Sequence, residues 1–270
     1  MVRSPPLPPD VIRARRKLPG GRHGPAAAGA GGPGGLPGCP GGPRGGAGGG
    51  RGPAAVEAAL REAAALFPRR LLGAALPALV LRHQLYGLAG DRTAVDRHLN
   101  RLRDEGRVRL LHLGLGGDAL GVVSTEEYAQ KVLQAVSGSP REGLVRRFLE
   151  GAVGACPLPG YDQRLLRQLG FGDADVTQLV AAGVLTVRDA GSWWLAVPGI
   201  GRFVRALVRG RRALLGAVRR SRHRELLLAE LGQRPPPALG LRYLLLDLLG
   251  AELLRSVPTA SGPLLRLAEP

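Results

Sequence analysis

The chain has 270 residues, of which 44% are apolar and 4% aromatic, so it can form one large domain or two to three small ones with cores of Leu, Val and Ala. Its formal net charge is +17, and every basic residue except Lys17 and Lys131 is an arginine, which predicts attraction to polyanions. The longest apolar run, 71–81, contains Pro77 and is too short to cross a bilayer, and no apolar segment near the N-terminus resembles a secretory signal. We therefore expect a soluble, intracellular protein that contacts no membrane.

The pattern of cysteine and histidine gives no indication of a metal. Cys39 and Cys156 lie far apart, and the five histidines show no ligand spacing. This argues against a disulfide framework and against a zinc site. We expect neither a metal nor a cofactor.

Residues 1–54 differ in composition from the rest of the chain. They contain 17 Gly and 11 Pro, and 8 basic against 1 acidic side chains, a net charge of +7. Such a segment cannot bury a core, so we expect a disordered tail. Within it, basic residues cluster at Arg13, Arg15, Arg16 and Lys17. Two interpretations of this cluster stay open: a nuclear-import signal, or part of a solvated basic tail.

From Ala54 onward the apolar residues take helical spacing. We predict a helix over 54–67 that Pro68 ends, a second over 76–86, and a third that opens at 91–93 and ends at Gly106, with Thr93 and Asp96 as a capping box. Strands are predicted over 108–113 and 120–123, and a closing helix over 125–136. Three helices followed by a hairpin is the order of a winged helix, a helix-turn-helix with a β wing.

The pattern recurs twice. Helices over 140–152, 161–169 and 173–182 precede strands over 184–188 and 192–197, which flank the turn Asp189-Ala190-Gly191. A third and more degenerate copy has helices over 200–220, 223–232 and 239–254 and a wing strand over 264–267. The predicted fold is mainly α with small β wings (α+β), arranged as three tandem winged-helix domains. Their predicted bounds are 55–138, 139–200 and 201–270, after the disordered tail 1–54.

The second basic stretch, 202–234, carries 10 basic and 2 acidic side chains, a net charge of +8. At about 100° per residue, the predicted helix places its apolar side chains on one face and a row of arginines on the opposite face. No acid interrupts the row before Glu225, whereas solvated faces usually alternate charges. We predict phosphate binding, because the planar guanidinium pairs with phosphate through two hydrogen bonds. The predicted DNA-binding residues are Arg205, Arg209, Arg212, Arg219, Arg220, Arg222 and Arg234.

Two other features are candidates for contacts. The helix that opens at 91–93 carries groove-facing candidates but also four acids, so DNA recognition and a purely structural role both stay open. The candidates are Arg92, Arg97, His98, Asn100, Arg101 and Arg103. In the second wing, strand alternation is expected to send one of Trp193 and Trp194 inward and leave the other at the surface. The surface tryptophan is a candidate to anchor a partner or stack on a base.

Several stretches of the chain closely resemble one family. They read LFPR at 66–69, PALVLR at 77–82, DRT at 91–93, GVLTVRDAGSWWLAVPG at 183–199, RELLL at 224–228 and SGPLLRL at 261–267. These stretches resemble the winged-helix repair factors catalogued as serine/threonine-protein kinase 19. The likeness covers residues 55–270 and leaves out 1–54, and the string at 183–199 is highly specific.

The resemblance implies a nuclear, DNA-binding protein that acts in transcription-coupled nucleotide excision repair at stalled RNA polymerase II. It implies a role in placing the repair-transcription helicase complex on downstream DNA, together with RNA binding and dimerisation on DNA. Basic positions that bind DNA in the family correspond to Arg205, Arg219 and Arg234, and the family has lysine at Arg205. The alternative is a protein-interaction scaffold whose positive charge serves acidic partners.

The residues do not support kinase activity. A kinase needs a glycine-rich loop on a strand, a strand lysine, a catalytic Asp–Asn loop and a metal-binding Asp. Past residue 54 the only lysine is Lys131, in a predicted helix, and the chain has no His-Arg-Asp motif. Asp189-Ala190-Gly191 is predicted to be a hairpin turn. We therefore expect no enzymatic activity and no catalytic residues.

Overall fold

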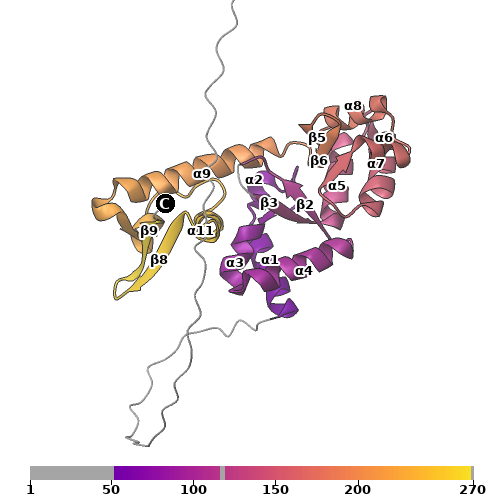
Figure 1. Ribbon diagram of the computed structural model, residues 1–270. Helices are drawn as coiled ribbons and strands as arrows, with labels where there is room; N and C mark the ends of the chain where they lie inside the picture. Colours follow the sequence, from indigo (N-terminus) through magenta and orange to yellow (C-terminus); the bar gives the residue numbers. More distant parts are fainter. Residues whose placement is uncertain (1–51, 116–118, 269–270) are drawn as a thin grey trace, which may run out of the picture. The chain divides into compact units, whose positions relative to one another are not determined.

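One order of elements occurs three times along the chain: a helix, a short strand, two helices and a hairpin (Figure 1). The computed structural model describes residues 52–115 and 119–268. The predictions for residues 1–51, including the basic cluster at 13–17, lie outside these residues. The predicted tail is too long at its end, because Pro53 and Ala54 already belong to the first helix, α1 (Pro53–Ala65). Along the described part of the chain, no helix has the length and apolar character needed to cross a bilayer.

The first repeat contains a short strand where the sequence predicts a helix. Its elements are α1 (Pro53–Ala65), α2 (Arg69–Leu72), β1 (Val80–Leu81), α3 (Arg82–Ala89), α4 (Arg92–Asp104), β2 (Val108–His112) and β3 (Leu120–Ser124). The predicted helix over 76–86 is wrong in its first half, since Val80 and Leu81 pair with β3 and α3 begins only at Arg82. Residues 78–81 are all buried, and a short buried apolar run does not distinguish strand from helix.

The cap of α4 also differs from the prediction. Asp91, rather than Thr93, is the N-cap, and its Oδ1 accepts a hydrogen bond from the Ala94 amide at 3.0 Å. Gly106 follows the helix with a φ of 73°, a left-handed conformation that glycine adopts at low cost. The predicted end of the helix is thus confirmed.

Helix α5 (Thr125–Val136) leads into the second repeat. Its elements are α6 (Glu142–Phe148), a wide helical turn (Leu149–Val153), β4 (Gly160–Asp162), α7 (Gln163–Gln168), α8 (Asp173–Ala181), β5 (Leu185–Asp189) and β6 (Ser192–Leu195). The predicted helix at 161–169 starts later, because Tyr161 lies in β4 and Asp162 caps α7 by accepting from the Leu165 amide. The hairpin turn predicted around Gly191 is confirmed.

The third repeat departs most from the prediction. Its elements are α9 (Gly201–Arg220), a 3-10 turn (Arg222–Arg224), β7 (Glu225–Leu227), α10 (Leu228–Gly232), α11 (Leu241–Gly250), β8 (Leu254–Thr259) and β9 (Gly262–Leu267). The helix predicted over 223–232 is interrupted by β7, since His223 and Arg224 have φ values of 62° and 57°. The helix predicted over 239–254 ends at Gly250, and β8 supplies the wing strand that the sequence did not predict.

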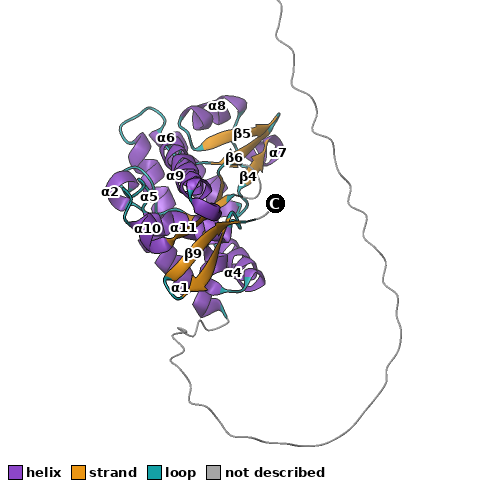
Figure 2. Cartoon of the chain, turned by 90° about the vertical axis from the view of Figure 1, so that its left-hand side faces the viewer, coloured by secondary structure: helices purple, strands orange, loops and turns teal. Residues whose placement is uncertain are grey.

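The three sheets of the described residues share one strand order. They are β1-β3-β2, β4-β6-β5 and β7-β9-β8, and all their pairings are antiparallel. In each, the short strand pairs with the last strand of the repeat. Helices predominate, and the strands form small separate sheets (Figure 2), which agrees with the predicted α+β class.

Two apolar cores hold the described chain together. The smaller lies under α1 and α4 and includes Val56, Val95 and Leu99. The larger contains residues of all three repeats. For example, the Phe203 ring of α9 lies 6.2 Å from the rings of both Phe67 and Tyr243. Because its apolar face belongs to this core, α9 has a fixed orientation, and its opposite face is presented to solvent.

Candidate nucleic-acid interface

Helix α9 separates apolar from basic side chains along its whole length. The predicted core face is confirmed, since its residues are buried. They are Phe203, Leu207, Gly210, Leu214 and Val218. Arg205, Arg209, Arg212 and Arg219 are exposed. At the C-terminal end, Arg219 and Arg220 lie in the last turn, where positive charge is favoured by the helix dipole.

The exposed arginines have no counter-charge within the described protein. We call Arg205, Arg209, Arg212, Arg219, Arg220, Arg222 and Arg234 the arginine face. All seven are exposed, and none of their guanidinium groups forms an ion pair or hydrogen bond with another described residue. Several exposed arginines elsewhere pair with acids, as Arg146 does with Glu142 and Arg167 with Asp173. The arginine face is therefore available to an external polyanion.

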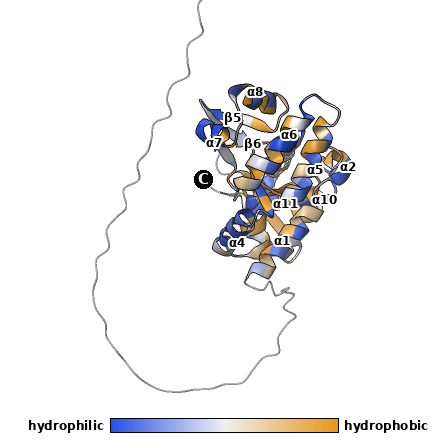
Figure 3. Ribbon diagram, turned by 90° about the vertical axis from the view of Figure 1, so that its right-hand side faces the viewer, coloured by the Kyte–Doolittle hydropathy of each residue, from blue (hydrophilic) through white to orange (hydrophobic). Residues whose placement is uncertain are grey.

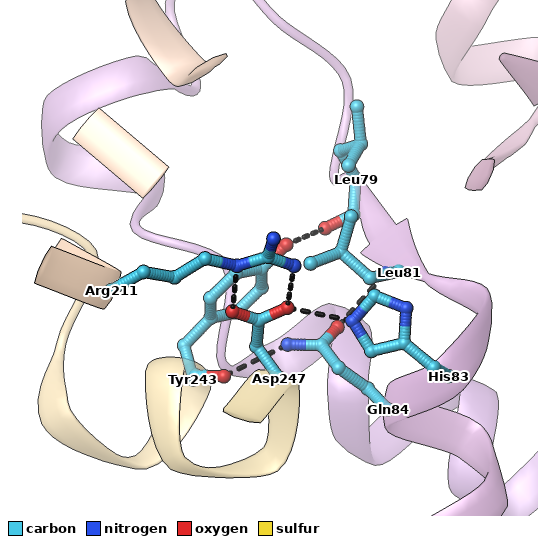
Figure 4. Close-up of polar contacts among 7 residues, drawn as sticks. All are labelled: Leu79, Leu81, His83, Gln84, Arg211, Tyr243 and Asp247. Atoms are coloured by element: carbon cyan, nitrogen blue, oxygen red, sulfur yellow. Dashed lines mark hydrogen bonds and ion pairs between the residues drawn. The ribbon is translucent and has the colours of Figure 1, made fainter. Parts of the chain in front are cut away.

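One arginine of α9 is turned inward. Arg211 donates from Nε and Nη2 to the two carboxylate oxygens of Asp247 in α11, at 2.7 and 2.6 Å. His83 Nε2 in α3 lies 2.6 Å from the same carboxylate (Figure 4). Burial alone would raise the pKa of Asp247, but the hydrogen bonds and charges of Arg211 and His83 outweigh it and hold that pKa below its ordinary value. These contacts join the first repeat to the third.

Two buried polar side chains reinforce this junction. Gln84 Oε1 accepts from the Leu81 amide at 2.9 Å, and its Nε2 donates to the Tyr243 carbonyl at 2.9 Å. The Tyr243 hydroxyl donates to the Leu79 carbonyl at 2.8 Å (Figure 4), and burial raises the pKa of that hydroxyl far above its ordinary value. The network positions α9 relative to α3 and α11. The sequence did not predict it, although Asp247 is the one acid within an apolar run.

The third helix of each repeat is less suited to a nucleic-acid groove. Helix α11 is mostly buried, from Tyr243 to Leu248. Helix α8 opens with Asp173 and Asp175. Helix α4 presents mainly hydrophilic residues in Figure 3, of both signs.

The candidate side chains on α4 have different surroundings. His98 is buried, with its Nδ1 2.8 Å from Arg101 Nη2. Its prediction as a groove-facing candidate is therefore wrong. Arg92 pairs with Glu252 and Arg103 with Asp104. Arg97 and Asn100 are exposed, and neither side chain contacts a polar partner among the described residues. Helix α4 thus offers a weaker basic surface than α9.

The two tryptophans do not divide into one inward and one outward side chain. Both are half-buried. Trp194 stacks on His112 of β2 with ring centroids 4.9 Å apart, and Arg188 lies 4.4 Å from its centroid. Trp193 packs against the larger core and lines a groove of about 360 Å³ beside Val187, which is 64% exposed. Trp194 thus joins the first two repeats, and Trp193 reaches a groove.

A glycine beneath Trp194 makes this stacking possible, and its replacement gives a first prediction. Gly160 pairs with Trp194 across β4 and β6, and a Cβ at 160 would lie 2.9 Å from the indole ring. We expect Gly160→Ala to lower the free energy of unfolding by about 1–3 kcal/mol, measured by urea denaturation. Gly143→Ala is the control, because a Cβ at 143 in α6 meets nothing within 4 Å. Equal midpoints for the two variants would contradict the prediction.

Among the described residues, no group of His, Cys, Asp or Glu has the arrangement of a metal site.

Fold and surface together define an α+β protein of repeated helix–hairpin units with one cationic helix face. The family described as inactive serine-threonine protein kinase 19 matches residues 69–236. Winged helix repair factor 1 of Homo sapiens is 49% identical over 221 residues, 80% of this chain and 87% of that protein.

Two other relatives give the same result. Winged helix repair factor 1 of Mus musculus is 50% identical over 215 residues, 78% of this chain and 85% of its own. The Xenopus laevis protein of that name is 46% identical over 209 residues, 76% of this chain and 80% of its own. The chain therefore belongs to the family of inactive serine-threonine protein kinase 19, whose relatives are named as winged-helix repair factors. The description of the family as inactive agrees with the missing kinase motifs.

Proposed function

We propose that this protein is a non-catalytic adaptor that binds duplex DNA through backbone phosphates. The observation that carries the proposal is the arginine face, whose exposed guanidinium groups have no partner among the described residues. Unpaired like charges repel one another, and phosphates relieve that repulsion while accepting bidentate hydrogen bonds. Phosphate contacts position a protein without specifying bases, so we expect little sequence preference.

We also propose that the three repeats are tandem winged-helix domains, bounded at 55–138, 139–200 and 201–270. Each has the order helix, strand, helix, helix, hairpin, which fits a helix-turn-helix with a wing. In this arrangement the main DNA contact comes from the first helix of the third domain. The third helices of the repeats are less suited to this contact, because α11 is mostly buried, α8 opens with two acids and α4 carries charges of both signs.

The names of the relatives support a role in DNA repair. We propose that the protein acts in the nucleus, in transcription-coupled nucleotide excision repair at stalled RNA polymerase II. There it would help place the repair-transcription helicase complex on DNA. RNA is a second polyanion that the same face would accept, and dimerisation on DNA belongs to this proposal.

A second function, protein scaffolding, is supported by the groove at Trp193. Val187 is 64% exposed beside that half-buried ring, and with Val176 and Val180 the two side chains form a continuous apolar lining, the kind of surface that marks partner contacts. The two functions are compatible, since the groove and the arginine face use different elements.

Titration of duplex DNA across a salt series tests the DNA-binding proposal. If about six phosphates are neutralised, the logarithm of the association constant should fall with the logarithm of the salt concentration at a slope near −5. We expect the triple variant Arg205→Glu, Arg209→Glu, Arg212→Glu to bind more than about tenfold more weakly and to reduce the slope by about 3. Fluorescence anisotropy with the full chain measures both quantities.

A control of equal charge separates the arginine face from net charge. Arg61 on α1, Arg141 in the turn before α6 and Arg164 on α7 are exposed, and their triple change to Glu alters net charge by the same amount. We expect its DNA affinity to stay within about threefold of the parent. Equal losses in both triples would overturn the assignment and favour the scaffold alternative.

A further inference from the structure

Two hollows run along α9 beside the arginine face. The first, about 430 Å³, lies between α9, α2 and the loop at 237–238, and the second, about 400 Å³, between α9, α10 and the loop at 234–237. Both are lined by Ala213 and Pro237, so they adjoin, and we call them together the α9 furrow. Each volume is within the range of about 300–1,000 Å³ typical of ligand sites.

The furrow combines an apolar floor with a cationic rim. Leu71, Leu72, Ala206 and Ala238 line the first hollow, and Leu214, Ala217, Leu231 and Leu241 line the second. The rim consists of Arg202, Arg205, Arg209, Arg220 and Arg234, and no Asp or Glu lines either hollow. Leu72, Leu214, Ala217 and Leu231 of this lining belong to the larger core. The floor is therefore the edge of that core that stays open beside α9, with the exposed side chains of Leu71 and Ala213 along it.

Phosphate binding does not account for the floor. A DNA backbone gains nothing from leucine, alanine and proline, and Leu71 remains 48% exposed at one end of the furrow. A ligand that carries carboxylates beside large apolar side chains would bury the floor and neutralise the rim together. Recognition of acidic motifs by arginine clusters, and of apolar side chains by grooves, are both common modes of peptide binding.

We propose that the α9 furrow binds an acidic segment of a partner protein that carries spaced leucine or phenylalanine side chains. Its rim shares Arg205, Arg209, Arg220 and Arg234 with the arginine face, so the peptide and duplex DNA compete. The proposal rests on the floor and does not require that the DNA-binding proposal hold. Arg212 and Arg219 line neither hollow, which allows the two ligands to be separated by mutation.

The probe is a fluorescein-labelled peptide in which Asp and Glu alternate with Leu and Phe, with a second peptide that has Ser in place of Leu and Phe. We expect the full chain to bind the apolar peptide more than about tenfold more tightly than the serine peptide. Ala213→Gln should fill the junction of the two hollows and weaken the apolar peptide about tenfold, with duplex affinity within about twofold. Unlabelled duplex should displace the peptide from the parent protein.

Two control variants keep the test decisive. Ala174→Gln places the same change at an exposed position of α8 and should leave peptide binding unchanged. Arg212→Gln with Arg219→Gln should weaken duplex binding and spare the peptide. Equal affinity for the two peptides, or an intact peptide complex in Ala213→Gln, would overturn the proposal. If instead the arginine pair leaves duplex binding intact, the DNA proposal loses support while the furrow stands.

Discussion

Replacing Arg211 by methionine is expected to lower the free energy of unfolding by about 3–5 kcal/mol, because it leaves a buried carboxylate with too few partners. The side chain of Asp247 has no exposed surface. In the parent protein Arg211 satisfies both of its oxygens, at 2.7 and 2.6 Å. In the variant, the carboxylate of Asp247 keeps only its contact with His83 Nε2, at 2.6 Å. Urea denaturation followed by circular dichroism measures the loss.

A neighbouring arginine provides the matched control. Arg212 lies on the same helix, exposed and outside the network, so Arg212→Met should change stability by less than about 0.5 kcal/mol. Adding Asp247→Asn to Arg211→Met should restore part of the loss, since the uncompensated charge is then gone. If Arg211→Met and Arg212→Met are equally stable, the network does not hold the repeats together.

The amphipathic helix α9 could be predicted from the sequence because both of its determinants are local. Phe203, Leu207 and Leu214 recur at helical spacing, and the arginines recur between them. The hairpin around Gly191 could likewise be predicted, since a turn glycine separates two apolar runs. Both features depend on neighbouring residues alone.

The short strands β1, β4 and β7 could not be predicted in this way. Val80 is a strand residue because Val122 is its partner, and Leu226 because Leu265 is. Pairing at such distance in the sequence leaves no local pattern, and strand propensity depends on context. The missed strands made the predicted helices at 76–86, 161–169 and 223–232 too long.

Contacts between repeats escaped prediction for the same reason. Arg211 looks like another cation of the basic stretch, and only the fold brings it to Asp247, 36 residues away. Strand alternation alone predicts that Trp194 and Trp193 point to opposite faces of the sheet. Its surroundings are instead set by His112 of another sheet. The furrow likewise requires Leu71 and Pro237, from distant segments, to lie along α9.

Gly250→Ala is expected to separate α3 from α11. A Cβ at 250 would lie 2.0 Å from the His83 carbonyl oxygen and 2.6 Å from its carbon. These are backbone atoms, so no rotamer change relieves the overlap, and one helix must move. We expect the free energy of unfolding to fall by about 3 kcal/mol, the upper end of the usual cost of overpacking, as measured by urea denaturation.

The sign of this effect distinguishes it from helix propensity. Gly250 has no left-handed backbone conformation, so without the overlap alanine would stabilise the helix. Gly87→Ala in α3 is the control, since a Cβ there meets nothing within 4 Å, and it should raise stability by about 0.5–1 kcal/mol.

Gly250→Ala and Arg211→Met both act at the junction of α3 and α11. Their combined loss should therefore be smaller than the sum of the single losses. Strict additivity would mean that the helix contact and the buried ion pair are independent.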